Sequence, residues 1–210
     1  DTSMSESQQI IPLDILPATP ARWNDLVELF GPNGACAGCW CMFWRTPHAM
    51  FNAMGNDERY AALQSLTTSE LPPGVLVYQY GKAIGWCAVG PREHFAAIER
   101  SRSLKRIDEQ PVWAIVCFFV AKPYRRRGVT QALIRGALEF AQRHGARIVE
   151  AYPLDLTSHK YTGQRLSGAA GFEGSAATFR ATGFSEVRRA SASKLYMRYE
   201  FTNVENQHHE

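Results

Sequence analysis

The 210-residue sequence has no apolar run close to the roughly 20 residues that a membrane-spanning helix needs. It also lacks a strong excess of charge, because 23 lysines and arginines against 20 aspartates and glutamates leave a net charge of +3. That value is too small to argue for nucleic acid by itself. The first nine residues are polar, without the charged-then-apolar layout of a secretory signal. We therefore expect neither a membrane nor a nucleic acid as partner.

Cysteine is scarce and odd in number, with five residues in the chain. Together with the polar start, this argues against a disulfide framework and favours reduced thiols and a cytoplasmic location. Hydrophobic residues make up 45% of the chain and charged residues 20%, as in ordinary globular proteins. No repeat or linker divides the chain, so we expect one domain over residues 10–202 with flexible ends at 1–9 and 203–210.

Hydrophobic patterning predicts strands interspersed with helices. Residues 10–16 suit an edge strand because Pro12 removes a hydrogen-bond donor, and residues 112–120 form a nine-residue apolar run typical of a central strand. Thr19-Pro20 and Asn56 are expected to begin helices. The remaining expected elements are a hairpin of strands 75–80 and 83–89, a helix from 129 to about 144, strands 147–152, 184–188 and 195–201, a Gly- and Ser-rich mobile loop at 162–174 and a short helix at 176–182. This order predicts an α/β or α+β domain with a mixed sheet.

The most informative segment is the basic turn between the apolar strand and the helix that follows it. Backbone N–H groups at the start of a helix have no intrahelical partner and, with the helix dipole, favour a phosphate. Gly128 allows a ligand close to the backbone, and Arg125, Arg126 and Arg127 add positive charge. We expect a pyrophosphate here. A surface turn that only aids solubility is the alternative, while the Walker and Rossmann glycine patterns are absent.

The order of elements resembles the GNAT N-acetyltransferase superfamily over most of the chain, from Leu13 to Phe201. Arg125-x-x-Gly128-x-Thr130 is similar to the family motif [R/Q]-x-x-G-x-[G/A], and Gly183-Phe184 is similar to its Gly-Phe segment. The resemblance implies a mixed, mostly antiparallel central sheet flanked by helices, with acetyl-CoA as cosubstrate. It further implies that CoA contacts the end of the long strand and the following turn, at Phe118, Phe119, Val120, Arg125, Arg126, Arg127, Gly128, Val129 and Thr130.

The implied reaction is direct attack of a neutral amine on the thioester, with the oxyanion stabilised by a backbone N–H of the central strand. An alkyl ammonium has a pKa near ~10.4, so a base or a water relay is useful at pH 7. Many family members carry a tyrosine four residues before the Gly of Gly-Phe as a proton donor. Phe179 stands there in this chain and has no proton to give.

Glu150 and Tyr152, on the strand after the phosphate-binding helix, are the candidates for base and acid. An ionised Glu150 among apolar residues is costly unless it is paired. It is therefore either a base with a raised pKa in the cleft or a carboxylate paired with an arginine. Weaker candidates for the same roles are Glu93, His94, Asp155 and His159.

Three cysteines and several aromatic residues follow the first helix. In a GNAT-type fold this region covers the acceptor cleft, so Trp40 and Trp44 are expected to contact the acceptor. Zinc binding by Cys36, Cys39 and Cys41 with His48 is the alternative, but no second ligand pair exists, and we expect no metal. Cys87, Cys117, Trp86 and Trp113 look like core residues.

The sequence thus predicts an enzyme that acetylates a primary amine, with a small-molecule acceptor favoured by the aromatic segment. A catalytically silent acyl-CoA-binding domain is the first alternative. A nucleic-acid-binding module using the basic stretch 92–106 is less favoured, because acidic residues interleave with its arginines. A homodimer is expected only because dimers are the commonest oligomers.

Overall fold

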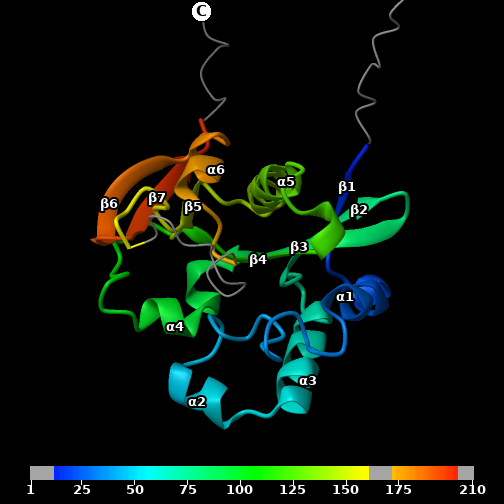
Figure 1. Ribbon diagram of the computed structural model, residues 1–210. Helices are drawn as coiled ribbons and strands as arrows, with labels where there is room; N and C mark the ends of the chain where they lie inside the picture. Colours follow the sequence, from blue (N-terminus) through cyan, green and yellow to red (C-terminus); the bar gives the residue numbers. More distant parts are fainter. Residues whose placement is uncertain (1–11, 161–171, 203–210) are drawn as a thin grey trace, which may run out of the picture.

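The computed structural model describes residues 12–160 and 172–202. A seven-stranded sheet in the order β1-β2-β3-β4-β5-β7-β6 forms its centre. Neighbouring strands are antiparallel except β4 and β5, which run parallel. Helices cover both faces of the sheet (Figure 1). The mixed, mostly antiparallel sheet expected from the sequence is confirmed.

The strands are β1 (Asp14–Pro17), β2 (Gly74–Gln79), β3 (Lys82–Pro91), β4 (Trp113–Val120), β5 (Ile148–Ala151), β6 (Ser185–Ser191) and β7 (Lys194–Glu200). The α-helices are α1 (Trp23–Phe30), α2 (His48–Ala53), α3 (Asn56–Thr67), α4 (Ala96–Glu99), α5 (Val129–Arg143) and α6 (Ala176–Arg180). Short 3₁₀ helices are η1 (Pro20–Arg22), η2 (Arg92–His94) and η3 (Lys122–Tyr124). Within the described ranges, no helix combines the length and the apolar character required to cross a membrane.

Both predicted helix starts differ in detail. After Thr19 the chain first makes the 3₁₀ turn η1, and the Thr19 hydroxyl accepts a hydrogen bond from Arg22 instead of capping the helix. The N-cap of α3 is Gly55 rather than Asn56, and its N–H donates to Glu58 Oε2 at 2.6 Å. Asn56 is the first residue inside the helix, and its Oδ1 accepts the indole N–H of Trp40 at 2.9 Å.

Two hydrophobic layers sandwich the sheet. The amphipathic helix α5 buries Leu133, Ile134 and Ala137 against one face. The opposite face carries an aromatic core that includes Trp23, Trp86 and Phe30 and is covered by α1, α3 and α4 (Figure 1). The sheet therefore separates two cores, and only the strand ends and connecting loops remain free to form a site.

The edge strand β1 is held to α5 by a close approach at Gly136. A methyl group there would lie 2.4 Å from Ile15 Cγ2, closer than packed atoms come. We therefore expect Gly136→Ala to lower the free energy of unfolding by about 1–3 kcal/mol through overpacking. In urea denaturation, the double variant Gly136→Ala/Ile15→Ala should cost less than the sum of the single changes. Additive effects would contradict this contact.

Candidate functional site

The parallel strands β4 and β5 separate after a short contact. Only Trp113, Ala114 and Ile115 of β4 pair with β5, which ends at Ala151. The register between β3 and β4 shifts beside Val116, which has no partner on β3. Such a bulge bends a strand and ends regular pairing. The remaining length of β4 thus leaves a gap on its β5 side.

Residues 172–175 lie in this gap. The Phe118 N–H donates to the Phe172 carbonyl at 2.7 Å, and the Phe119 and Phe172 rings stack with centroids 6.4 Å apart. On the other side, the Leu154 N–H donates to the Gly174 carbonyl at 3.2 Å. Most of the predicted mobile loop 162–174 falls outside the described residues. Its last three residues close the opening between the strands.

The turn after β4 presents a row of backbone donors. From Arg126 to Gln131, none of these N–H groups has an acceptor within the part of the chain that the structure describes. Arg126 and Gly128 both adopt positive φ, 61° and 77°, which turns successive N–H groups toward one concave face. Arg125 bends back, and its Nε donates to the Val120 carbonyl at 2.8 Å.

This turn fits an anionic ligand. It lies at the N-terminus of the 15-residue helix α5, where the helix dipole adds positive potential. Arg126 and Arg127 are exposed beside the free N–H groups. A Cβ on Gly128 would meet nothing within 4 Å, so the space in front of the backbone is open. These observations suit a pyrophosphate, which needs several donors and little steric hindrance.

A cavity of about 380 Å³ opens beside the gap. Its walls come from the segment before and within α2, from Cys117 of β4 and from the residues that fill the gap. The lining residues are Cys36, Ala37, Cys39, Cys41, Phe43, Trp44, Phe51, Cys117, Phe172 and Glu173. The candidate site thus combines the basic turn after β4 with an aromatic cavity beside the same strand.

The sequence profile of the Acetyltransferase (GNAT) family matches residues 37–165, more than half of the chain. The chain belongs to the GNAT acetyltransferase family. Solved structures share the GNAT fold at low sequence identity. A ribosomal-protein-alanine N-acetyltransferase from Brucella melitensis has 17% identity and a TM-score of 0.50, covering 90% of this chain and 99% of that one.

Two further structures agree. A GCN5-related N-acetyltransferase from Kribbella flavida has 15% identity and a TM-score of 0.51, with 90% and 98% of the chains covered. The protein yncA from Salmonella typhimurium, solved with its cofactor acetyl-CoA, has 12% identity and a TM-score of 0.50, with 92% and 96% covered. A search of curated protein sequences gives no match.

In this GNAT domain the two predicted acceptor-binding tryptophans lie in different places. Trp44 lines the cavity. Trp40 is buried instead in the aromatic core, with its ring 4.9 Å from Tyr60 and its indole N–H bonded to Asn56. Its φ of 43° turns the side chain inward, which sequence periodicity does not reveal. Trp40 therefore cannot line the cavity wall.

The cysteine cluster does not assemble as a metal site. No group of three or more Cys, His, Asp or Glu side chains within residues 12–160 and 172–202 could hold a metal ion. Cys87 lies in the core as predicted. Cys117 is half-buried and packs against the aromatic core, but it also lines the cavity. The bulge places Val116 and Cys117 on the same face of the sheet, which the sequence did not predict.

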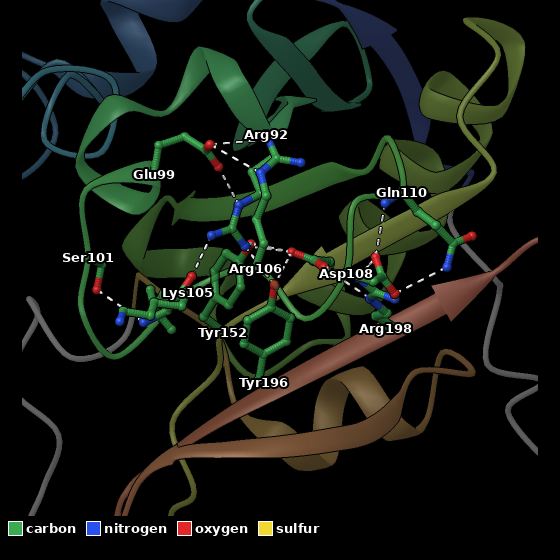
Figure 2. A network of polar contacts seen from close by, with 12 residues as sticks. Arg92, Glu99, Ser101, Lys105, Arg106, Asp108, Gln110, Tyr152, Tyr196 and Arg198 are labelled. Carbon is green, nitrogen blue, oxygen red and sulfur yellow. Dashed lines mark hydrogen bonds and ion pairs between the residues drawn. The ribbon is translucent and has the colours of Figure 1, made fainter.

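Glu150 does not face the cavity. It is fully buried, and its Oε2 accepts hydrogen bonds from Arg92, Tyr152 and Tyr196 at 2.8, 2.7 and 2.6 Å. Its Oε1 accepts from Arg198 at 3.0 Å. Figure 2 shows Arg92, Tyr152, Tyr196 and Arg198 close together in this polar network. The arrangement matches the paired carboxylate that the sequence left as an alternative.

Glu150 and Tyr152, the two side chains expected to act as base and acid, are hydrogen-bonded to each other inside this network. Burial, with the nearby Glu150 carboxylate, raises the pKa of the Tyr152 hydroxyl well above its usual value, so it stays protonated and donates to Glu150. Arg92 also pairs with Glu99, and Arg198 with Asp108 at 2.6 Å. These contacts anchor the segment after β3 to β5 and β7.

The weaker candidates are also placed away from the cavity walls. Asp155 accepts from Thr157 and Arg189, which lowers the pKa of Asp155 to about 2. Burial and the charge of Arg45 lower the pKa of His94. Glu93 and His159 are exposed. Phe179, at the position of the family tyrosine, packs against Phe118 with ring centroids 5.9 Å apart.

Sequence reasoning missed several residues of the site. Phe172 and Glu173 line the cavity, although their segment was expected to be a mobile loop. Phe43 and Phe51 also line it, and only the general aromatic content of their segment pointed there. Phe172 and Glu173 line the cavity because their segment lies between β4 and β5, and no local sequence pattern indicates such a long-range contact.

Proposed function

We propose that this GNAT domain transfers an acetyl group from acetyl-CoA to the primary amine of a small molecule. The observation that carries the proposal is the row of N–H groups from Arg126 to Gln131, for which the described part of the chain offers no acceptor. These groups directly follow β4, whose C-terminal half no longer pairs with β5. Backbone donors in a concave row suit the CoA pyrophosphate. An open strand edge suits an amide-containing chain such as pantetheine.

Each part of the site has an assigned role in this proposal. The N–H groups from Arg126 to Thr130 bind the pyrophosphate, with Arg126 and Arg127 neutralising its charge. The end of β4, from Phe118 to Val120, pairs with the pantetheine arm. For that pairing, the Phe172 carbonyl must leave the Phe118 N–H, which becomes free to donate to the bound cosubstrate or to the developing oxyanion.

The cavity supports a small-molecule acceptor. A volume of about 380 Å³ lies at the lower end of the range for small-ligand pockets. Aromatic walls from Phe43, Trp44 and Phe51 favour an apolar or planar amine. Glu173 also lines the cavity, and its carboxylate is paired with Lys194 at 2.8 Å.

The test is acetyl-CoA-dependent release of CoA with a panel of amines, followed by chromatography. We expect 2-phenylethylamine and tryptamine to be acetylated with a higher kcat/KM than spermidine or a peptide N-terminus. Turnover of the peptide alone would contradict the small-molecule acceptor. Calorimetric binding of acetyl-CoA without turnover of any amine would instead support a catalytically silent domain.

The nucleic-acid alternative loses support from the basic stretch. Arg92 is fully buried in the Glu150 network, and Arg106 pairs with Glu99 at 3.2 Å. Two of the arginines that suggested a basic surface are thus neutralised within the protein. Only Arg100, Arg102 and Lys105 remain exposed there.

A further inference from the structure

Arg45 is a buried cation without an acidic side chain to balance it. It is nine-tenths buried, and its NH2 group donates to the Pro73 carbonyl at 2.6 Å. Its Nε has no hydrogen-bond partner, and no carboxylate lies within 4.0 Å among the residues that the structure describes. A guanidinium stays protonated in proteins, and a buried charge is costly unless it is paired.

The acidic groups next to Arg45 are thiols. Its electrostatic neighbours are Cys41 and Cys117, and both sulfurs border the same cavity. Cys41 Sγ also accepts the indole N–H of Trp86 at 3.2 Å. A sulfur that accepts a hydrogen bond and faces a guanidinium is stabilised as a thiolate.

The position of Cys41 beside Trp86 requires a strained backbone conformation. Trp40 and Cys41 have φ values of 43° and 55°, a conformation that non-glycine residues rarely adopt. Each such residue stores about 1–3 kcal/mol of strain, which persists only when the surroundings enforce it. The strained turn directs the Cys41 side chain toward Trp86, in the cavity wall that Cys117 also lines.

We propose that Cys41 and Cys117 form a reactive thiol pair, in which Cys41 takes a small two-electron oxidant of the peroxide class and Cys117 closes the disulfide. The Cys41 thiolate attacks the peroxide O–O bond, which gives a sulfenic acid and, with one proton, water. The Cys117 sulfur then attacks the Cys41 sulfur. Its thiol proton and the departing hydroxide leave as a second water, so the two thiols lose two electrons to the peroxide.

The titration of the two thiols supports this order of events. Hydrogen bonding from Cys117, with the charge of Arg45 and the Trp86 N–H, lowers the pKa of Cys41 against the effect of burial. The same hydrogen bond and burial raise the pKa of Cys117, which therefore keeps its proton. The other titratable groups facing Cys41 are Cys39 and Cys87, and burial raises both of their pKa values.

Oxidation of the reduced protein by hydrogen peroxide tests the pair. We expect two thiols to disappear, leaving three of the five, with a cross-link between the peptides that contain Cys41 and Cys117 and recovery on addition of dithiothreitol. Cys41→Ser and Cys117→Ser should each prevent the cross-link. Cys36→Ser, in the wall of the same cavity, is the matched control and should still form it. Retention of all five thiols, or a cross-link through Cys36 or Cys39, would overturn the proposal.

Alkylation by iodoacetamide tests the role of Arg45. Removing the charge with Arg45→Met should slow modification of Cys41 at pH 7 by about tenfold for each unit that its pKa rises. Arg45→Lys should retain most of the wild-type rate. If the methionine variant does not fold, Trp86→Phe removes the indole donor, together with part of a buried ring, and should also slow the reaction. If Cys41 were alkylated at the wild-type rate in the folded variants, Arg45 and Trp86 would not stabilise its thiolate.

The consequence for acetyl transfer rests on the proposed function, whereas disulfide formation does not. Oxidised protein should still bind acetyl-CoA by calorimetry but should lose CoA release with amines, because the disulfide crosses the cavity wall. Thiol loss in a protein that binds no acetyl-CoA in either state would disprove the proposed function alone. Acetyl-CoA binding without any thiol loss would disprove the thiol pair alone.

Discussion

Replacing Glu150 with alanine should lower the free energy of unfolding by about 3 kcal/mol or more. The carboxylate accepts from two buried guanidinium groups and two tyrosine hydroxyls, and alanine leaves all four without that acceptor. Arg92 keeps Glu99 and Arg198 keeps Asp108, so the loss stays at the lower end for a broken buried ion pair. Urea denaturation of the purified variant measures the effect.

A glutamate in an exposed ion pair is the matched control, because it tests the loss of a carboxylate charge without the loss of a buried acceptor. Glu139 pairs with Arg143 one turn away on the exposed face of α5, so Glu139→Ala should change stability by no more than about 0.5 kcal/mol. Glu150→Gln, which keeps the side-chain volume, should lie between the two. If Glu150→Ala were as stable as the wild type and yet kept only a small residual activity with an altered pH–rate profile, Glu150 would be the base after all.

Replacing Gly128 with tryptophan should weaken acetyl-CoA binding by about 100-fold or more. The new side chain would enter the open space before the N–H groups that we assign to pyrophosphate binding. Loss of two charge-assisted hydrogen bonds, at about 1.5–3 kcal/mol each, accounts for that factor. Isothermal titration calorimetry with acetyl-CoA is the measurement.

The control for this variant lies at the other end of the same helix. Gly145 has a φ of 85° and, like Gly128, nothing within 4 Å of the position of a Cβ. Gly145→Trp therefore carries the same cost of about 1–2 kcal/mol for a left-handed non-glycine residue, far from the cofactor turn. Binding lost equally in both variants would indicate a general structural effect, and binding kept in Gly128→Trp would place the pyrophosphate elsewhere.

Local patterns were sufficient to predict the strand-turn-helix unit and the hairpin of β2 and β3. The apolar run ending at Val120, the turn with Gly128 and the amphipathic helix after it all lie within about 30 residues, where period and composition determine the elements. The GNAT fold and the family followed from that unit and from the segment ending in Gly183-Phe184.

Long-range contacts explain what was not predicted. The single extra residue Val116 turns Cys117 toward the cavity, and nothing in an apolar strand sequence marks a bulge. Glu150 looks like a cleft residue until Arg92 and Arg198 meet it from positions 58 and 48 residues away. Register and ion pairing of this kind depend on packing between distant elements, which periodicity does not encode.

The brief contact between β4 and β5 also divides the sheet into two antiparallel parts, which we expect to exchange their amide hydrogens as two units. β1 to β4 form one antiparallel meander-like half, and β5, β7 and β6 form the other, with three residue pairs between them. Since the amides of a cooperative unit open together, hydrogen exchange should group by half rather than spread evenly across seven strands. The proposed acetyl-transfer site would then lie between the two halves, and ligand binding would couple them into one more slowly exchanging body.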